Sequence, residues 1–585
     1  FHIVERLLNR EDVTCIYVCT DWGREGEYIY RLVEQMAGVK GKERRRVWID
    51  SQTEEEILRG IREAKDLSEY DNLSASAYLR AKEDYLMGIN FSRLLTLKYG
   101  NSISNYLGNK YTVVSVGRVM TCVLGMVVRR EREIREFVKT PFYRVIESVN
   151  VDGHTFTGEW RAVKGSAYFE SPKLYKENGF KEKEEAKKLI AVLKEGTSPL
   201  TCRIVSIEEK KNPPLLFNLA ELQNECSKRF KISPDETLRI VQELYEKKLV
   251  TYPRTDARVL STAVSKEITK NLNGLSKYQM AAPYMQDILH YGAYKNLAKT
   301  RYVNDKQITD HYAIIPTGQG LSALNSVSAT AHHVYDVIVR RFLSIFYPPA
   351  VYQKVALITQ IGKEQFFSNF RVLAEEGYLK VAGVPAPKKN ANGNDAEGDG
   401  SDNNVDLDAA FFASIQKLKK GDILDVKSLD IKEGETSPPK RYNSGSMILA
   451  MENAGQLIED EELRAQIKGS GIGTSATRAE IVKKLVSNKY IALNKKTQIV
   501  TPTLTGEMIV NVVSASIGSL LNPTLTASWE KGLTYVAEGS VTEEEYMQKL
   551  DKFVTQKTNI VKQNNFQYQL RQSFDQIAPY YQKKK

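Results

Sequence analysis

Hydrophobic and polar positions change their spacing several times along the chain, and each change predicts a new kind of element. Residues 14–20 form a short β-prone apolar run, and an acidic stretch after it leads into a segment with helical spacing. Residues 142–210 alternate apolar and polar positions, as strands with one buried face do, and residues 350–382 show a similar β-like pattern. From about 218 to 250, and again after 440, apolar residues recur at the spacing of an amphipathic helix. The pattern therefore predicts a chain with α/β, β-rich and helical parts.

A polar segment interrupts this pattern. Residues from Pro385 to Asn404 are rich in Pro, Gly, Asn, Asp and Lys and contain almost no apolar side chain, so we expect a flexible loop or insertion there. At about 150 residues per domain, a chain of 585 residues is expected to form roughly four folded units.

Composition narrows the class of protein. Lys plus Arg outnumber Asp plus Glu by 83 to 72, and the net charge of +11 suits a polyanionic partner such as nucleic acid. No apolar run approaches the roughly 18 residues of a membrane helix, and the first residues lack the features of a secretory signal. The 5 cysteines form no Cys-x-x-Cys pair, which argues against zinc ribbons and a disulfide framework. We therefore expect a cytoplasmic protein without a membrane segment and, because its first residue is not Met, one that starts inside a longer reading frame.

Two carboxylates follow the first apolar run. Asp21 and Glu25 lie in a turn at the carboxyl end of a predicted strand, where open α/β sheets usually place their sites. Carboxylate oxygens are the ligands that Mg²⁺ prefers. Taken alone, an Asp-x-x-x-Glu spacing is more often a solvated acidic turn that caps the next helix.

A tyrosine beyond the helical segment at 218–250 has the surroundings of a nucleophile. Tyr252 lies in Leu249–Asp256, with Arg254 two positions further on. A phenol with an ordinary pKa near 10 becomes a useful nucleophile only where its proton is removed and positive charge stabilises the attacked group. Since the chain contains 31 tyrosines, position alone proves nothing.

Five further strings combine charged, hydroxyl or glycine residues with short apolar runs. They are Arg44–Ser51 followed by Thr53–Glu55, Arg80–Asn90, Ser115–Thr121, Asp310–Thr317 and Gly471–Ile481. Taken alone, His311 in the fourth string is more often a satisfied structural residue than a functional one. The fifth string alone indicates a glycine-rich turn before a capped helix, an interpretation compatible with an anion contact by Arg478.

Taken together and in this order, the strings resemble the motifs of type IA DNA topoisomerases, from about residue 1 to about residue 560. Leu249–Asp256 is similar to the family's active-site string. Asp21–Glu25 resembles the Asp-x-Asp-x-Glu motif of Toprim domains, and Arg24–Glu27 matches the version of this motif that reads Arg-Glu-Gly-Glu. The single-chain layout without zinc modules looks most like the bacterial topoisomerase III group.

The resemblance implies a role for each matching residue. Tyr252 would attack a backbone phosphate and keep a 5′-phosphotyrosyl link, while Arg254 orients it and steadies the phosphate. His311 would bind the scissile region, and Asp21 and Glu25 would hold Mg²⁺. The residues that would contact DNA are Arg80, Asp84, Ser115, Arg118 and Arg478.

The resemblance also implies a toroidal architecture that combines α/β, α and β domains. Its parts would be a partial Toprim domain at 1–70, a helical domain IV at 71–137 and 438–560, a β-rich arch or domain II at 138–212 and 348–437 with the flexible insertion 385–404, a helical domain III with Tyr252 at 213–347, and a tail at 561–585. For the tail, both stacking of single-stranded bases on its aromatic residues and a terminal helix with a frayed end remain open.

Three departures from the family pattern are specific. Gly23 stands where the second Asp of the Toprim motif is expected, and Met120 replaces a Gln that would bond to DNA. No string matches the family's opening motif, in which a Glu acts as general acid near a Lys, so we expect an N-terminally truncated chain. A proton transfer of this kind is typically worth about 10²–10⁴ in rate.

The resemblance implies an ATP-independent enzyme that cleaves one DNA strand, passes another through the gap and religates it, relaxing negative supercoils or decatenating DNA. The absence of a P-loop string fits this chemistry. The alternative is a catalytically impaired remnant that only binds single-stranded DNA. A Toprim primase or nuclease is disfavoured, because those proteins lack the Tyr-Pro-Arg-Thr-Asp segment. We expect a monomer that acts on single-stranded and negatively supercoiled DNA, with a partner helicase left open.

Overall fold

The computed structural model divides the chain into two compact units. It describes residues 1–49, 53–196, 199–308, 311–384, 404–406, 409–467 and 471–582. Unit 1 comprises Phe1–Arg132, Leu215–Phe342 and Arg441–Lys585, and unit 2 comprises Glu133–Pro214 and Leu343–Lys440. The segment Leu215–Phe342 is therefore connected covalently to the rest of unit 1 only through the segments of unit 2 that precede and follow it. Most of the predicted insertion 385–404 lies outside the described residues.

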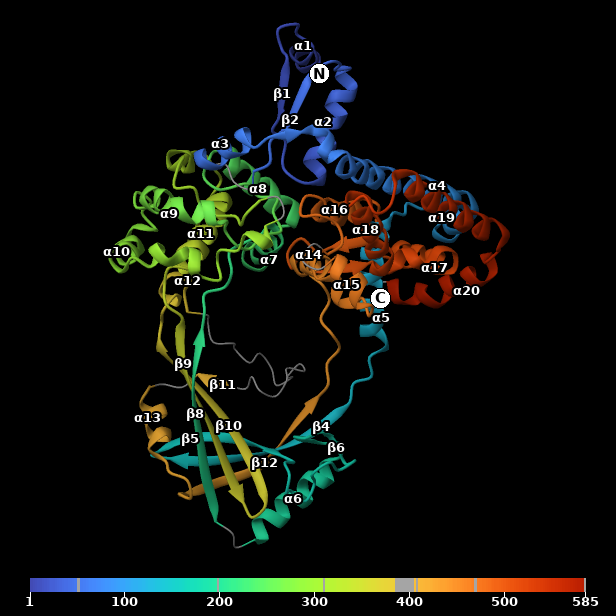
Figure 1. Cartoon of the computed structure of the whole chain (residues 1–585). Helices are drawn as coiled ribbons and strands as arrows, with labels where there is room; N and C mark the ends of the chain where they lie inside the picture. The colour runs from blue at the N-terminus through green and yellow to red at the C-terminus, as the bar shows by residue number, and fades with distance from the viewer. Residues whose placement is uncertain are drawn as a thin grey trace. The chain divides into compact units, whose positions relative to one another are not determined.

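The N-terminal part of unit 1 is a small α/β layer. Its elements are α1 (His2–Leu8), β1 (Cys15–Val18), α2 (Arg24–Ala37), β2 (Glu43–Arg46), α3 (Glu54–Arg62) and β3 (Lys65–Asp66). β1 pairs in parallel with β2, which pairs antiparallel with β3, so β1 is an edge of this described sheet. Ile16 and Val18 from β1 pack against Tyr30 of α2 and Leu67. In Figure 1, α2 runs beside β1 and β2, which is the strand, turn and helix that the sequence pattern predicts.

The remainder of unit 1 is helical. Its longer helices are α4 (Asp71–Leu107), α5 (Arg118–Glu136), α7 (Leu219–Phe230), α8 (Pro234–Glu246), α9 (Thr262–Leu275), α10 (Ala282–Tyr291), α11 (Ala329–Ser344), α14 (Ser444–Glu452), α15 (Glu461–Gln466), α16 (Arg478–Ser487), α17 (Leu504–Ile517), α18 (Pro523–Ala537), α19 (Glu543–Gln563) and α20 (Gln567–Ile577), with a hairpin of β13 (Ile491–Leu493) and β14 (Val500–Pro502). Local sequence explains the start of α8, because the Ser233 hydroxyl accepts from the Glu236 amide and Pro234 takes the first helical position.

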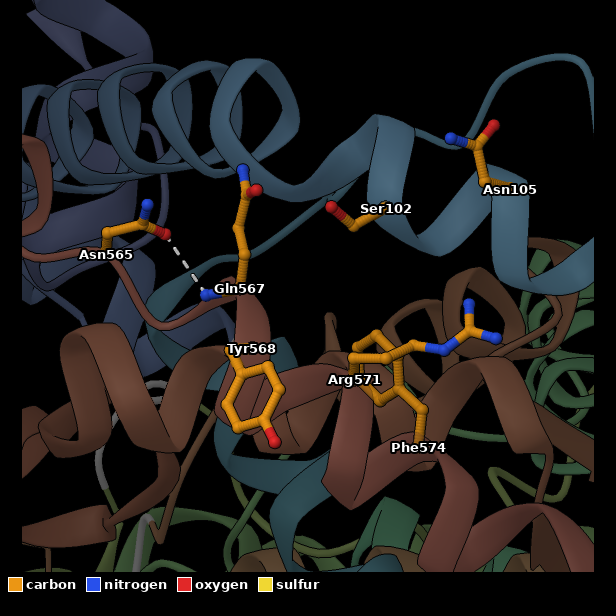
Figure 2. Close-up of a pocket in the computed structure, with 7 residues that line it drawn as sticks. All are labelled: Ser102, Asn105, Asn565, Gln567, Tyr568, Arg571 and Phe574. Carbon is orange, nitrogen blue, oxygen red and sulfur yellow. Dashed lines mark hydrogen bonds between the residues drawn. The ribbon is translucent and has the colours of Figure 1, made fainter.

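The C-terminal residues continue this helical part. α19 runs through the predicted boundary at 560/561, and α20 buries Leu570, Phe574 and Ile577. Figure 2 shows α20 facing the end of α4, with Phe574 beside Arg571. The described part of the tail is therefore a packed helix, which agrees with the terminal-helix alternative.

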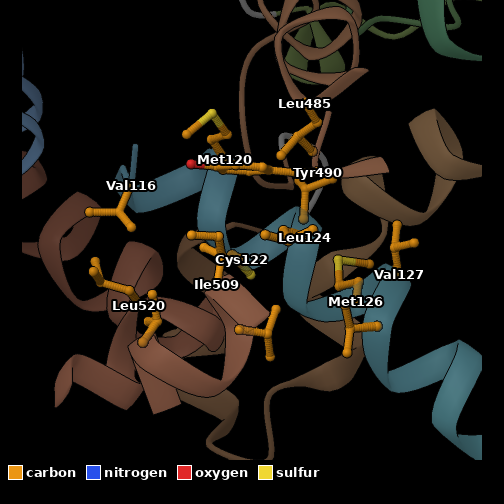
Figure 3. Packing of buried hydrophobic residues seen from close by; sticks show 14 of the residues in the cluster. Val116, Met120, Cys122, Leu124, Met126, Val127, Leu485, Tyr490, Ile509 and Leu520 are labelled. Atoms are coloured by element: carbon orange, nitrogen blue, oxygen red, sulfur yellow. The ribbon is translucent and has the colours of Figure 1, made fainter. Parts of the chain in front are cut away.

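One large hydrophobic core joins the early and late segments of unit 1. α5 contributes Cys122, Leu124 and Val127, which pack with Ile509 of α17 and Leu485 of α16 (Figure 3). Within the described chain, one stretch, Leu504–Ala537, is long and apolar enough to cross a membrane by length and composition. It is weak evidence for a membrane span, because core helices pass the same test and half of its most apolar 18-residue window is buried inside the protein.

In the residues that the structure describes, unit 2 is built on a nine-stranded sheet. Its strands are β4 (Pro141–Val151), β5 (His154–Arg161), β6 (Leu174–Lys176), β7 (Gly179–Phe180), β8 (Leu200–Lys211), β9 (Ala350–Ile361), β10 (Glu364–Glu375), β11 (Asn404–Asp406) and β12 (Ile423–Glu435), accompanied by α6 (Lys183–Glu195), α12 (Leu379–Ala382) and α13 (Ala409–Lys417). The long strands β8, β9 and β10 are adjacent in this sheet, as Figure 1 shows. Burial alternates along β4 and β9, which explains the period of two in the sequence. α12 occupies the end of the range 350–382, which the pattern predicted as β-like throughout.

A buried carboxylate lies inside this sheet. The side chain of Glu147 on β4 is fully buried and accepts a hydrogen bond from the Thr359 hydroxyl of β9. Gly158 on β5 leaves room for it, because a Cβ there would lie 2.6 Å from Glu147 Oε1. Burial raises the pKa of Glu147 from 4.5 to about 7.

The Glu147→Gln variant is expected to flatten the dependence of unfolding free energy on pH. The raised pKa means that the folded protein binds this proton more tightly than the unfolded chain does. The resulting stabilisation is fully present below about pH 4.5 and is lost as the pH rises through about 7. The variant should therefore be more stable than the parent at pH 8, by up to about 3 kcal/mol, measured by chemical denaturation at pH 5 and pH 8. Glu208→Gln, at an exposed position on β8, is the control, and equal pH profiles for parent and Glu147→Gln would contradict the prediction.

Candidate active site

Two segments of unit 1 run side by side and hold Tyr252 in place. The Thr251 amide donates to the Ile315 carbonyl (3.0 Å), and the Ile315 amide donates to the Thr251 hydroxyl (2.9 Å). Four residues further along the chain, the Thr255 hydroxyl donates to the His311 carbonyl (2.6 Å). Bonds on both sides of Tyr252 thus bring the strings 249–256 and 311–317 together. Asp310 of the predicted string lies outside the described residues.

Tyr252, His311 and Asp21 form a row of contacts. The rings of Tyr252 and His311 have their centres 4.4 Å apart, and His311 Nε2 lies 3.6 Å from Asp21 Oδ2. The interaction with His311, helped by the Arg46 charge, holds the pKa of Asp21 below its usual range. Tyr252 is half-buried and also packs edge-to-face on Tyr245, whereas Arg254, two positions further along the chain, is exposed. Three residues predicted from separate strings therefore meet at one place.

The backbone conformation of the turn that carries Asp21 and Glu25 is explained by its glycines and by one buried arginine. Arg46 on β2 is fully buried and donates to the carbonyls of Thr20 (2.7 Å) and Asp21 (2.6 Å). Gly26 is required, since a Cβ there would lie 1.7 Å from the Asp21 carbonyl oxygen. Gly23 has φ +104°, which an Asp at this position would adopt only with strain. The departure from the Toprim pattern at Gly23 therefore agrees with the backbone conformation of the turn.

The carboxylates near this turn differ in their availability to a metal. Asp21 and Glu25 are exposed, whereas Glu27 is fully buried and is held by Arg31 (2.8 Å) and Arg46 (3.0 Å). Within the described residues, no group of three or more His, Cys, Asp or Glu side chains is gathered closely enough to hold a metal ion. Asp21 and Glu25 thus offer carboxylate oxygens, and any further ligand would come from water or substrate.

The predicted DNA-contacting residues Arg80, Asp84 and Arg118 belong to an ion-pair cluster centred on the buried Arg118. Arg118, at 3% exposure, lies 3.0 Å from Glu83 Oε1, 3.1 Å from Asp84 Oδ1 and 3.2 Å from Glu530 Oε1. Arg80 reaches the same Glu530 oxygen at 3.4 Å, and Arg24 of the acidic turn reaches its other oxygen at 3.0 Å. Burial alone would raise the pKa of Glu530, but the three arginines lower it. The cluster ties α4, α5 and α18 to the turn of Asp21.

Ser115 and Met120, from the same string as Arg118, have different surroundings. The Ser115 amide donates to the Tyr490 hydroxyl (2.8 Å), and its side chain is half-buried. Met120 is 7% exposed and packs in the core near Tyr490 (Figure 3). In this structure Met120 is a core residue, which accounts for an apolar side chain where the family has Gln.

Arg478 is also turned into the protein. It starts α16, is 1% exposed and lies 2.8 Å from Asp256 Oδ1. Asn218 completes this group, since its amide donates to Glu452 Oε1 (2.6 Å) and to the Asp256 carbonyl (3.1 Å). Burial raises the pKa of Glu452, although the Arg478 charge opposes the shift. The polar cluster therefore connects the Tyr252 segment with the C-terminal helices of unit 1.

The same two parts of unit 1 meet closely between α7 and α14. The hydroxyls of Ser227 and Ser444 are buried and 3.1 Å apart. A Cβ on Gly445 would lie 2.7 Å from Asn224 Cα, so only Gly allows this approach. Since Leu215–Phe342 has no direct chain connection to the rest of unit 1, such contacts hold it in place.

The sequence patterns did not predict several residues that shape the site. Arg46, Glu83, Asp256, Glu452 and Glu530 each make buried ion pairs or hydrogen bonds at these clusters. Arg46 and Asp256 lie inside strings that resemble family motifs, and this position was the only sign in the sequence that they matter. No sequence pattern marked Glu452 or Glu530, because their partners are far away in the sequence.

Comparison with known proteins defines the class to which this fold and site belong. The family model for DNA topoisomerase matches residues 68–548, so the chain belongs to the DNA topoisomerase family, as a type IA enzyme. DNA topoisomerase 3 of Bacillus subtilis (strain 168) is 32% identical over 569 residues, which cover 97% of this chain and 71% of that protein. DNA topoisomerase 3 of Shouchella clausii (strain KSM-K16) is 33% identical over 562 residues, covering 94% of this chain and 69% of that protein. The predicted similarity to bacterial topoisomerase III is thus confirmed.

A solved structure shows the fold independently. Full-length topoisomerase I from Thermotoga maritima superimposes with a TM-score of 0.64 and 21% sequence identity, covering 94% of this chain and 79% of that chain. The predicted mixed fold of a type IA topoisomerase is therefore confirmed.

Proposed function

We propose that this topoisomerase cleaves single-stranded DNA with Tyr252, whose oxygen attacks a backbone phosphate and releases the 3′ oxygen of the neighbouring nucleotide. The observation that carries the proposal is the row of contacts from Tyr252 through His311 to Asp21. A tyrosine that forms a covalent bond to phosphorus needs a neighbour that accepts or orients its proton and a positive charge at the phosphate. His311 would serve the first task, and exposed Arg254 would serve the second.

Mg²⁺ fits the carboxylates of the acidic turn. Asp21 and Glu25 would hold it, because both are exposed and neither is occupied by a buried arginine as Glu27 is. Mg²⁺ is commonly bound by one or two carboxylates together with substrate phosphates, so the absence of a third side-chain ligand suits a DNA-linked site. When bound there, it neutralises charge on the DNA backbone. The contact with His311 lowers the pKa of Asp21, which favours the ionised form that would bind a metal.

The chain connectivity supports strand passage. Leu215–Phe342 carries Tyr252 and can separate from the rest of unit 1 without breaking the chain, since only non-covalent contacts join the two directly. Many of these contacts are polar, such as Arg478 with Asp256 and Asn218 with Glu452, and polar groups can exchange one another for water when an interface opens. The protein would act as a cytoplasmic monomer on single-stranded and negatively supercoiled DNA.

The proposal is tested by relaxation of negatively supercoiled plasmid with this 585-residue chain at varied Mg²⁺. Relaxation that EDTA abolishes and added Mg²⁺ restores is the expected result. The Asp21→Asn variant should need at least about tenfold more Mg²⁺ for half-maximal relaxation, since it weakens a metal ligand. Asp12→Asn, at an exposed position paired with Arg10, is the control.

Two other outcomes would have clear meanings. Tight, salt-sensitive binding of single strands with no nicking at any Mg²⁺ concentration would favour the catalytically impaired DNA-binding remnant. An unchanged Mg²⁺ requirement in Asp21→Asn would remove Asp21 from the metal site while leaving the nucleophile untouched.

A further inference from the structure

A cavity remote in sequence from the cleavage residues lies between the end of α4 and the start of α20. Its volume is about 550 Å³, within the range of small-molecule sites. It is lined by Ser102, Asn105, Asn565, Gln567, Tyr568, Arg571 and Phe574 (Figure 2). None of these seven residues belongs to the Tyr252 site, and none of them is acidic.

The walls of the cavity are held by polar and aromatic contacts between α4 and the chain from the end of α19 to α20. The Lys98 ammonium on α4 donates to the carbonyls of Val561, Lys562 (3.0 Å) and Asn564, which end α19. Phe574 packs edge-to-face on Tyr106 of α4, and the Tyr106 hydroxyl donates to Asp575 (2.9 Å). The two helices therefore present a preformed cavity.

The polar groups of the cavity combine donors with acceptors. Asn565 Oδ1 accepts from the Gln567 amide (3.2 Å), and Gln567 Nε2 donates to the Lys98 carbonyl (3.2 Å). This leaves Asn565 Nδ2 and Gln567 Oε1 to serve a ligand. Among the described residues, Ser102 and Asn105 have no side-chain hydrogen-bond partner, although both line the cavity. Amide and hydroxyl groups of this kind complement the edges of unstacked nucleobases.

The cavity lining also contains an exposed aromatic ring, that of Tyr568, and a guanidinium group, that of Arg571. Tyr568 is 73% exposed, yet its hydroxyl accepts from Gln572 Nε2 (3.1 Å), which limits its motion. Arg571 lies over the Tyr106 ring at 4.4 Å and is 3.8 Å from Asp575, so it is oriented at the rim of the cavity. Exposed aromatic rings beside basic groups are the usual means of holding single-stranded nucleic acid.

We propose that this cavity binds one nucleotide of single-stranded DNA, with the base stacked on Tyr568 and its edge read by the amide groups, and with Arg571 near a phosphate. The proposal rests on the chain's action on single-stranded DNA. Because the lining residues are separate from Tyr252 and its partners, the nucleotide belongs to a part of the strand that is not being cut.

The test measures binding of fluorescein-labelled single-stranded oligonucleotides to the full chain by anisotropy. Tyr568→Ala and Arg571→Ala should each weaken binding at least about fivefold, because loss of one stacking or phosphate contact has this order of effect. Tyr580→Ala is the matched control, since Tyr580 is 60% exposed on the same C-terminal segment but does not line the cavity. Circular dichroism would show that α20 remains folded in each variant.

A second arm separates base recognition from simple charge attraction. An oligonucleotide of the same length with abasic sites should bind more weakly to the parent chain and should lose the sensitivity to Tyr568→Ala. Equal affinity of parent and Tyr568→Ala for the normal oligonucleotide, while Tyr252 still forms covalent adducts, would overturn the nucleotide site and leave the cleavage mechanism standing. Absence of adducts with the parent chain would instead count against the proposed function.

Discussion

Replacing Tyr252 with Phe is expected to abolish covalent attachment to DNA and relaxation of supercoiled plasmid, with a loss of at least about 10⁴-fold in rate. The variant removes only the attacking oxygen, and the ring contacts with His311 and Tyr245 stay available. Trapping of labelled single-stranded oligonucleotides on the protein after denaturation measures the adduct directly. Binding of the uncut oligonucleotide should be unchanged within about twofold, because the hydroxyl acts on the phosphate during reaction.

Tyr245→Phe is the matched control for this experiment. Its ring packs edge-to-face on Tyr252, so the control removes a neighbouring hydroxyl from the same aromatic pair. It should retain adduct formation. Adducts that persist in Tyr252→Phe would assign the nucleophile to another of the chain's 31 tyrosines.

A covalent lock between α7 and α14 is expected to stop strand passage without stopping cleavage. The hydroxyls of Ser227 and Ser444 are buried and 3.1 Å apart, so the double variant Ser227→Cys with Ser444→Cys places two thiols within reach of a disulfide. Under oxidising conditions the segment with Tyr252 could no longer leave the C-terminal helices. Plasmid relaxation should fall below detection and return on reduction, whereas adducts on short single-stranded oligonucleotides should form throughout.

The two single variants, Ser227→Cys and Ser444→Cys, are the controls, and both should relax plasmid under either redox condition. They also test whether the native Cys226, which is buried next to Ser227, forms a disulfide with either introduced cysteine. Full relaxation by a verified oxidised double variant would show that this interface stays closed during the reaction. Strand passage would then need an opening elsewhere in the molecule.

The sequence by itself determined the family and the local elements around the site. The strand before Asp21, the helix after Gly23 and the helices before Tyr252 follow from periodicity and capping residues, which act over a few neighbouring positions. The strings around Tyr252 and His311 identified the chemistry, because their residue types and order are specific to type IA topoisomerases. In unit 2, the alternation of apolar and polar residues predicted the long strands but not α6, which lies inside the range 142–210.

Only the tertiary structure decided which charges are free to meet DNA. Arg118 and Arg478 look like phosphate contacts in the sequence, but they are buried against Glu83, Glu530 and Asp256. These partners come from remote segments, and an ion pair between such segments exists only when packing brings them together. The same holds for the cavity beside α20. Asn105 and Arg571 line one cavity only because contacts of Lys98 and Tyr106 hold this part of the chain against α4. Local patterns encode elements and motif chemistry, whereas burial and pairing depend on contacts across the whole chain.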